Sequence, residues 1–572
     1  MHYDGIISFL MNYINHEQLL NKSLWNKFTS VFTNRDDDKN LGWRAEYWGK
    51  MMRGACLCYQ YQHNKQLYQV LEKTVKDLLK KQDHLGRISS YSTKNEFRGW
   101  DIWGRKYVLT GLLHFANICE NIKLKKKIIS ALEKHTDYII DHVGKEKGKI
   151  PITHTSHIWL GVNSCSILES IVALYQISHK AKYLKFAKYI VETGGIKGGN
   201  LITSANNDKL LPYQYLENKA YETMSFFEGV LEYALVSKDN QLVKTAINFF
   251  EKVQQSEISI IGNAGSEDEN FSHGALRQTY QPKKFMQETC VVTTYMRIMA
   301  KLHLLTGDIK YYERFSTAAL NCFLGSVNNY HNCAKDYFNK KVLKDYLPFD
   351  SYSPLVNSSR GVSTGGLQFF KDHSFYGCCA SIGSASIGLM ALCYVINNRQ
   401  TIVFNDYYDN GTITTKGFKA IIKSNYIESG RVHLIIKKNS KEILLRIPSW
   451  SNKPSITING KVKFIKAGTY YKVNLTKGDI LLNFNPEIKT HHLNQMIAFS
   501  YGQFVLGIDE ESNPHLKLES LKADNIKLTK TKTNKNSLLT FTNENKLIFK
   551  DYASLGKHYN IKRNRLSVWI NQ

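Results

Sequence analysis

The feature that most constrains the fold of this chain is a weak internal repeat of turn-then-helix openings. They recur at intervals of about sixty residues, the length of a helical hairpin plus a loop. The openings are Asn64-Lys65-Gln66-Leu67-Tyr68, Lys123-Leu124-Lys125, Lys180-Ala181-Lys182-Tyr183-Leu184, Asp239-Asn240-Gln241-Leu242 and Asp308-Ile309-Lys310-Tyr311-Tyr312. A series of such hairpins predicts a closed toroid of paired helices, an (α/α)6 barrel, although a superhelical solenoid has the same local pattern. Long loops at 195–218 and 257–287 favour the barrel, which would build its site from them.

The hydrophobic period changes at about residue 400. Before it, apolar residues recur every three or four positions, which predicts helices over 47–61, 67–79, 107–118, 167–177, 226–235, 293–305 and 382–395. After it, 431–436, 442–447 and 455–458 read as strands, and Asn459-Gly460 signals a hairpin turn. We therefore predict a mainly α chain with β: an (α/α)6-barrel catalytic domain over residues 1–400, followed by one or more β-sandwich domains over residues 401–572.

Composition limits the partners and the compartment. The 572 residues carry a formal net charge of +27, but the lysines are spread along the chain without a long basic tract or a nucleic-acid-binding motif. We therefore expect a basic surface without nucleic acid. The N-terminus does not resemble a secretory signal, and no run of about twenty apolar residues predicts a membrane span. Ten cysteines without a secreted-domain framework fit a cytoplasmic protein with free thiols. The oligomeric state is open, with a homodimer allowed.

Two segments place cysteines at the start of a predicted helix. Met286-Gln287-Glu288-Thr289-Cys290 opens the helix that runs to Leu305, and Tyr376-Gly377-Cys378-Cys379-Ala380-Ser381 opens the helix that runs to about Val395. Free N–H groups and the helix dipole favour a thiolate at such positions. Three thiolates and one carboxylate make a closed tetrahedral set for zinc. The alternative is that these are buried apolar cysteines without a metal.

Several segments resemble the β-L-arabinofuranosidase family, glycoside hydrolase family 127 and its relatives, in a divergent branch. The cysteine motifs are the specific ones, and together the matches span most of the chain. They are Glu288-Thr289-Cys290, Cys378-Cys379, the Leu305-Thr306-Gly307-Asp308 turn with Tyr311 and Tyr312, the stretch 99–107 and, in the second domain, Leu445-Arg446-Ile447-Pro448-Ser449-Trp450. The stretch from Arg277-Gln278-Thr279 to Met286-Gln287-Glu288-Thr289-Cys290 resembles one branch of the superfamily in particular.

The resemblance implies a fold, a metal and a nucleophile. The family has an (α/α)6 barrel with β-sandwich domains and a zinc ion held by three cysteines and a glutamate. Carried over position by position, the ligands would be Glu288, Cys290, Cys378 and Cys379. Cys378 would also be the nucleophile that forms a thioglycosyl intermediate, since zinc keeps a sulfur deprotonated and oriented.

A retaining glycosidase also needs a group that protonates the leaving oxygen and then activates water. The family places a glutamate for this role in a Glu-x-Phe segment, which Glu269-Asn270-Phe271 matches best. The neighbouring Glu267 and Asp268 remain alternatives, and a solvated acidic loop is the interpretation without function.

The predicted sugar-facing wall departs from the family. Histidines that line the family pocket are replaced near Trp103-Gly104-Arg105, Gly161-Val162-Asn163-Ser164 and Ala220-Tyr221-Glu222. The pocket candidates are therefore Trp103, Arg105, Asn163, Tyr221 and Arg277, each of which could equally be a core or loop residue. This puts the identity of the sugar in question more than the class of reaction.

Together these observations predict a zinc-dependent retaining glycoside hydrolase, an exo-acting β-L-arabinofuranosidase-like enzyme on short oligosaccharides with a cysteine nucleophile. Two alternatives stay open. One is a non-catalytic zinc-containing carbohydrate-binding protein, and the other is a polysaccharide lyase or uronyl hydrolase on the same toroid, to which the positive charge would recruit uronates. The sugar and the linkage are not determined by the sequence.

Overall fold

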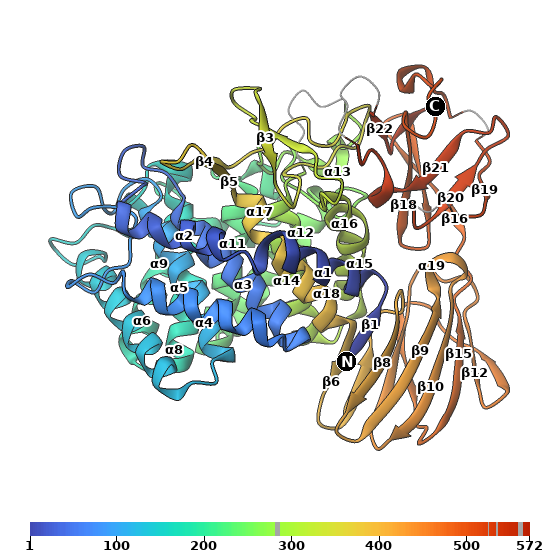
Figure 1. Cartoon of the computed structure of the whole chain (residues 1–572), viewed down its shortest axis with the longest axis horizontal. Coiled ribbons are helices and arrows are strands. Elements are labelled where there is room, and N and C mark those ends of the chain that lie inside the picture. The colour runs from blue at the N-terminus through green and yellow to red at the C-terminus, as the bar shows by residue number, and fades with distance from the viewer. Residues whose placement is uncertain (281–286, 524–525, 534–535, 559–563) are drawn as a thin grey trace.

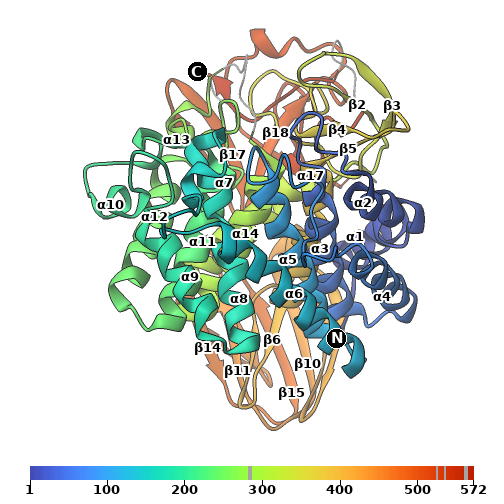
Figure 2. The same ribbon diagram turned by 90° about the vertical axis from the view of Figure 1, so that its left-hand side faces the viewer.

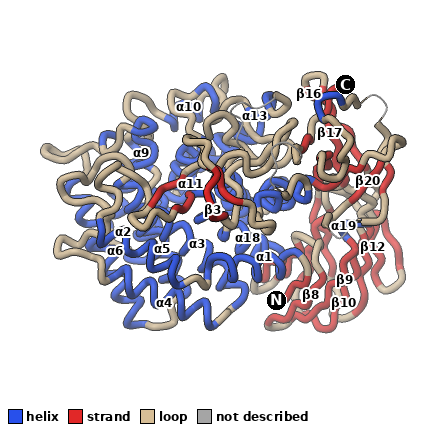
Figure 3. Tube along the Cα trace, turned by 45° about the horizontal axis from the view of Figure 1, so that its top comes forward, coloured by secondary structure: helices blue, strands red, loops and turns tan. Residues whose placement is uncertain are grey.

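The computed structural model describes residues 1–280, 287–523, 526–533, 536–558 and 564–572. A helical part and a β part lie side by side (Figure 1). With the view tilted, helices occupy one half and strands the other, apart from short strands that lie over the helices (Figure 3). The change of hydrophobic period near residue 400 therefore corresponds to a real change of architecture.

Six of the described helices form a closed inner ring. Going round it, each helix packs against the next: α3 (Ala45–Gln62), α5 (Asp101–Ile118), α8 (Leu168–Ser178), α11 (Ala220–Ser237), α14 (Thr289–Thr306) and α18 (Ser384–Tyr394), which returns to α3. Closure of the ring confirms the (α/α)6 barrel over the solenoid, in which the first and last helices would not meet.

An outer helix packs against each inner one. They are α4 (Lys65–Leu79), α6 (Ile122–His142), α9 (Ala181–Glu192), α12 (Asn240–Ser256) and α15 (Ile309–Ala318), while α1 (Ile6–Ile14), from the other end of the barrel sequence, covers α18. The five repeated openings of the sequence are the starts of these outer helices. Asn64, Asn121, Asp239 and Asp308 each accept a backbone N–H at the N-terminus of their helix, which is why the turn signal was readable.

The inner helices are buried almost all round, whereas the outer ones bury a single stripe, as on α4. Ion pairs join inner helices to one another. Arg53 of α3 binds Glu169 of α8 at 3.0 Å, and Arg297 of α14 binds the buried Glu228 of α11. Buried charges persist when they are paired in this way. These pairs link α3 to α8 and α11 to α14 inside the ring.

A long excursion separates the last outer helix from the final inner one. After α16 (Leu324–Ser326) the chain forms two short hairpins, β2 (Cys333–Lys335) with β3 (Val342–Tyr346) and β4 (Leu367–Phe369) with β5 (Phe375–Gly377). Figure 3 shows β3 lying across the helical half. The hydrophobic period did not predict this covering layer, because its strands are short and mostly exposed or half-buried.

The β part begins with two sheets packed face to face. One sheet has the order β1 (His2–Asp4), β8 (Asn410–Thr415), β9 (Phe418–Asn425), β10 (Arg431–Asn439), β15 (Gly478–Asn483), β12 (Ser455–Ile458) and β13 (Lys461–Phe464). The other has β14 (Thr469–Val473), β11 (Glu442–Ile447), β7 (Thr401–Phe404) and β6 (Val395–Asn397). The rings of Phe404 and Phe418 meet between the sheets at 6.1 Å. The predicted strands β10, β11 and β12 are confirmed, as is the Asn459-Gly460 hairpin.

A third sheet completes the chain, with the order β16 (Ile488–Leu493), β17 (Met496–Tyr501), β18 (Phe504–Asp509), β21 (Ile548–Asp551), β20 (Thr540–Thr542) and β19 (Thr529–Lys530); β22 (Leu566–Ser567) pairs with β18 and β23 (Ile570–Asn571) with β17. Seen from the helical end, the strands lie behind the barrel (Figure 2).

The N-terminus ties the two parts together. Strand β1 pairs with β8, and Asp409 accepts hydrogen bonds from the backbone N–H groups of Ile6 and Ile7 at the start of α1. We propose that residues 1–400 form the barrel domain and residues 401–572 the β domains. Strands β1 and β6 belong to the barrel domain in sequence but pair with strands of the β domains.

Candidate active site

The inner helices begin at one end of the ring, and the two cysteine motifs lie there. Glu288 is the N-cap of α14 and Cys290 its second residue. Gly377 is the N-cap of α17 (Cys378–Ile382), of which Cys378 and Cys379 are the first two residues. The prediction that both motifs open helices is confirmed, although Gly383 divides the second helix into α17 and α18. Met286, the first residue of the first motif, lies outside the described residues.

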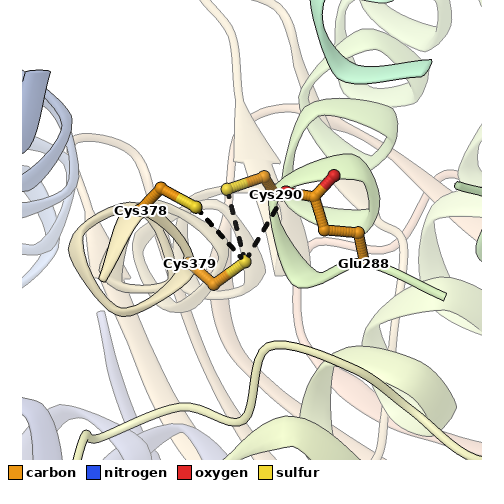
Figure 4. A group of neighbouring side chains, drawn as sticks. All are labelled: Glu288, Cys290, Cys378 and Cys379. Carbon is orange, nitrogen blue, oxygen red and sulfur yellow. Dashed lines mark hydrogen bonds between the residues drawn. The ribbon is translucent and has the colours of Figure 1, made fainter. Parts of the chain in front are cut away.

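The four side chains that sequence analysis assigned to a metal converge. One ligand atom from each of Glu288, Cys290, Cys378 and Cys379 lies within 4.8 Å of the others, and all four residues are buried. The Cys379 sulfur is the centre of the group, as Figure 4 shows. It lies 3.5 Å from the Cys290 sulfur, 3.9 Å from the Cys378 sulfur and 3.7 Å from Glu288 Oε1.

The chemistry of this group suits a metal ion. The sulfur–sulfur distances are far longer than a disulfide bond of about 2.05 Å, and all three cysteines are free. The second carboxylate oxygen of Glu288 is buried and has no hydrogen-bond partner among the described residues. A buried polar atom without a partner is costly. An ion that accepts three sulfurs and one carboxylate oxygen in tetrahedral geometry would remove this cost.

Electrostatics distinguish the three thiols. Contacts with Cys290 and Cys379, and the charge of Lys50, hold the pKa of the Cys378 thiol well below its usual value. Burial raises the pKa values of Cys290 and Cys379, and burial together with the Glu269 charge raises that of Glu288.

A cavity of about 600 Å³ opens above the cluster. Of the three cluster cysteines, Cys378 is the one among its described lining residues, joined from the ligand set by Glu288. Aromatic side chains make up much of the rest of the wall: Trp43, Trp100, Trp103, Trp159, Tyr221, Tyr337, Phe338 and Tyr352. Aromatic rings bind the C–H faces of sugars, while the indole and phenol groups hydrogen-bond their hydroxyls. A cavity of this size and lining can hold a small saccharide.

Glu269, the predicted acid/base, lies in the same wall. Its carboxylate accepts a hydrogen bond of 2.8 Å from Lys219 and one of 2.6 Å from the Tyr352 hydroxyl. The neighbouring acids lie differently. Asp268 also lines the cavity and accepts a hydrogen bond from the Tyr337 hydroxyl, whereas Glu267 pairs with Arg277 at 2.8 Å and is not among the described lining residues. The geometry favours Glu269 over Glu267, because Glu269 faces the cavity.

Three charged groups at the site were not predicted to act there. Glu46 and Lys50 pair at 3.1 Å on the cavity wall, and Lys50 Nζ lies 3.6 Å from the Cys290 sulfur. Glu222 lines the cavity with one buried oxygen that has no partner among the described residues. Burial raises the pKa values of Glu46 and Glu222 to about 7. Glu46 and Lys50 are four apart on α3, a spacing that brings two side chains together on a helix, but only the structure shows that the pair is buried.

Of the five predicted sugar contacts, two are among the described lining residues of the cavity and three are not. Trp103 and Tyr221 line the cavity, with ring centroids 5.4 Å apart. Arg105 is buried in ion pairs with Asp101 and Glu96, and Asn163 donates to the Gly99 carbonyl and the Ser156 hydroxyl. Arg277 bonds Glu267. Since Arg105, Asn163 and Arg277 are not among the described residues of the cavity wall, we do not retain them as sugar contacts.

Comparison with protein families gives the geometry a context. The model of the β-L-arabinofuranosidase catalytic domain of glycoside hydrolase family 127 matches residues 6–340, and that of the family's middle domain matches residues 401–480. The chain belongs to glycoside hydrolase family 127. It is therefore a glycoside hydrolase. None of the curated proteins matches the sequence.

Solved structures share the fold of this family 127 chain over its whole length. A family 127 β-L-arabinofuranosidase from Geobacillus stearothermophilus T6 aligns with a TM-score of 0.73 at 15% identity and covers 100% of this chain and 99% of its own. A second family 127 β-arabinofuranosidase gives a TM-score of 0.74 at 15% identity, with 100% of this chain and 96% of its own covered. At these identities the likeness concerns the fold.

A long apolar helical stretch lies in the family 127 barrel. Within the described residues, Ile158–Ser178 is long and apolar enough to cross a membrane by length and composition, but 67% of its apolar window is buried inside the protein. Because α8 belongs to the inner ring, its apolarity is explained by the packing of a core helix.

Gly366 packs directly against the Cys378 sulfur and allows a testable prediction. Gly366 has φ +61°, and a Cβ there would lie 2.1 Å from the Cys378 sulfur. We expect Gly366→Ala to displace this sulfur and to reduce bound metal, in addition to about 1–2 kcal/mol for the left-handed backbone. The measurements are metal content per chain and the free energy of unfolding.

Gly307→Ala is the matched control for this substitution. Gly307 has φ +69° at the end of α14, and nothing lies within 4 Å of its Cβ position. It should lose a similar free energy of unfolding and keep its metal. Equal metal content in the two variants would show that Cys378 tolerates the displacement.

Proposed function

We propose that this protein is a zinc-dependent retaining exo-glycosidase that releases a terminal sugar from short oligosaccharides, with Cys378 as nucleophile and Glu269 as acid/base. The observation that carries the proposal is that Cys378, alone of the three cluster cysteines, is among the described lining residues of the cavity, with Glu269 on the same wall. A β-L-arabinofuranoside is the first substrate to test, because the family model and the similar solved structures carry that name.

Glu288, Cys290, Cys378 and Cys379 would hold the zinc ion. Bound there, zinc supplies positive charge that keeps the sulfurs deprotonated and oriented. In the first step the Cys378 sulfur attacks the anomeric carbon, the glycosidic C–O bond breaks, and the carboxylic acid of Glu269 gives its proton to the leaving oxygen. The result is a sugar bound to the protein through a C–S bond.

In the second step the Glu269 carboxylate takes a proton from water. The water oxygen forms a bond to the anomeric carbon, and the C–S bond breaks to return the Cys378 thiolate. Two displacements at one carbon retain its configuration. Lys219 and Tyr352, both hydrogen-bonded to Glu269, fix the direction of its carboxyl group and stabilise the charge that it carries before it takes this proton.

The decisive experiment measures zinc content and hydrolysis together. Purified protein is assayed against a panel of aryl furanosides and pyranosides, and the configuration of the first-formed product is read by NMR. Hydrolysis with retention by a zinc-containing protein is the expected result. Bound zinc with no hydrolysis of any panel member would instead favour a carbohydrate-binding protein without turnover. Release of an unsaturated product that absorbs in the ultraviolet would favour a lyase.

Removal of the metal gives a further prediction. A chelator should abolish hydrolysis and lower the melting temperature by roughly 5–10 °C, since a ligand that binds the folded state tightly stabilises it by several kcal/mol. Added Zn²⁺ should restore both properties, and Mg²⁺ should restore neither because it prefers oxygen ligands. Full hydrolysis by protein shown to contain no metal would contradict the proposed role of the cluster.

A further inference from the structure

Trp159 reaches the cavity wall from a backbone in an unusual conformation. It belongs to η3 (Ile158–Gly161), a short 3-10 segment before the inner helix α8. Trp159 has φ 50° and ψ 44°, and Leu160 follows with φ 48° and ψ 25°. Both residues lie in the left-handed region of φ and ψ, which L-amino acids other than glycine rarely adopt. Two bulky residues in succession with this backbone conformation are strained.

Contacts from outside the cavity hold this turn in place. The backbone N–H of Lys197 donates to the Leu160 carbonyl at 2.8 Å. Gly161, with φ +85°, packs so closely that a Cβ would lie 2.5 Å from the Thr153 carbonyl oxygen. Backbone strain that the surroundings maintain is found preferentially at functional sites. The strain marks this turn as a candidate functional position, and the contacts of the Trp159 ring indicate the role of this residue.

The ring faces the lysine that binds the proposed acid/base. Lys219 Nζ lies 4.4 Å from the centroid of the Trp159 ring. The same ammonium donates to Glu269 Oε2 at 2.8 Å and to the Asp268 carbonyl at 3.0 Å. The Lys219 side chain is only 7% exposed, so little water competes for it. A buried ammonium gains from the electron-rich face of an indole, and this attraction is stronger when water is excluded.

We propose that Trp159 is a positioning residue: its indole face holds the Lys219 ammonium, which in turn aims the Glu269 carboxyl at the leaving oxygen. The inference rests on the proposed role of Glu269. It explains why a strained turn is kept at this wall, since the left-handed backbone brings the ring against Lys219. It also makes leaving-group protonation depend on a residue that need not touch the leaving group.

The test compares Trp159→Phe with Trp159→Leu on substrates with good and poor leaving groups. Phenylalanine keeps an aromatic face, although a weaker one, and leucine has none. We expect Trp159→Leu to lower kcat on poor leaving groups at least about tenfold more than on activated aryl glycosides, because protonation matters for the former. Trp159→Phe should recover most of this selective loss. Trp450 is a half-buried tryptophan of the β part, and Trp450→Leu is therefore the control for general effects on the fold.

Two results would overturn the inference. Equal loss on all substrates, seen as a raised KM with unchanged kcat, would mean that Trp159 only contacts the sugar. Equal effects of phenylalanine and leucine would show that the aromatic face is not needed. If the wild-type protein cleaves no glycoside, the proposed function itself fails. If it does, and Glu269→Gln shows the leaving-group dependence while Trp159→Leu does not, only the inference fails.

Discussion

Cys378→Ser should lower hydrolysis on the order of 10⁴-fold or more, the scale on which enzymes lose activity when their nucleophile is removed. The serine hydroxyl has a far higher pKa than the thiol and is a poor nucleophile without a general base. Glu288, Cys290 and Cys379 would remain to hold the metal, with weaker affinity. The informative quantity is therefore the rate per bound zinc, measured from metal content and turnover on the same sample.

The two roles of Cys378 separate in this measurement. If the cysteine only holds the metal, the rate per bound zinc should stay near that of the wild type, which would contradict its assignment as nucleophile. Cys393→Ser is the matched control, because Cys393 is buried on α18 and lies outside the cluster. It should keep both its zinc and its turnover. A trapped sugar bonded to Cys378, detected by mass spectrometry of the wild-type protein, would support the covalent step independently.

Glu269→Gln should slow substrates with poor leaving groups by about 10² to 10⁴-fold, and activated aryl glycosides far less in the first step. The amide cannot give a proton to the leaving oxygen, and it loses the ion pair with Lys219. For activated substrates the second step should then become limiting, because no carboxylate takes the proton from water. Azide, which attacks without losing a proton, should restore their turnover with a glycosyl azide as product. The measurement is kcat and kcat/KM across a leaving-group series.

The neighbouring acids provide the controls for this assignment. Glu267→Gln removes the ion pair with Arg277 and should have little leaving-group dependence. Asp268→Asn tests the other acid on the cavity wall, which accepts a hydrogen bond from Tyr337. If Asp268→Asn shows the selective loss and Glu269→Gln slows all substrates equally, the acid/base role belongs to Asp268.

The sequence predicted the parts of the fold that local interactions specify. The starts of the outer helices were readable because Asn64, Asp239 and Asp308 cap them through contacts within a few residues. Strands β10 and β11 were readable because they alternate buried and exposed positions over much of their length. The covering hairpins after α16 were missed, since short strands without a regular apolar period leave no such pattern.

At the site, too, the sequence indicated local features but not the direction in which each side chain points. Glu288, Cys290, Cys378 and Cys379 could be proposed because the motifs carry the donor types that a metal needs, at helix starts that a sequence can indicate. Arg105, Asn163 and Arg277 were chosen by position near a motif, and a helix presents neighbouring residues to different sides. Packing turned Arg105 to Asp101 and left Trp103, two positions earlier, on the cavity wall.

The sequence by itself indicated which side chains could hold a metal and that paired helices would carry them, while closure of these helices into a ring was visible only in the structure. Only the tertiary structure decided that Cys378, rather than the adjacent Cys379, lines the cavity. It also placed Lys50 beside Cys290, Lys219 and Tyr352 on Glu269, and Trp159 against Lys219. The physical reason is that consecutive residues on a helix point about 100° apart. Which of these directions faces the cavity is set by helices and loops that are distant in the sequence.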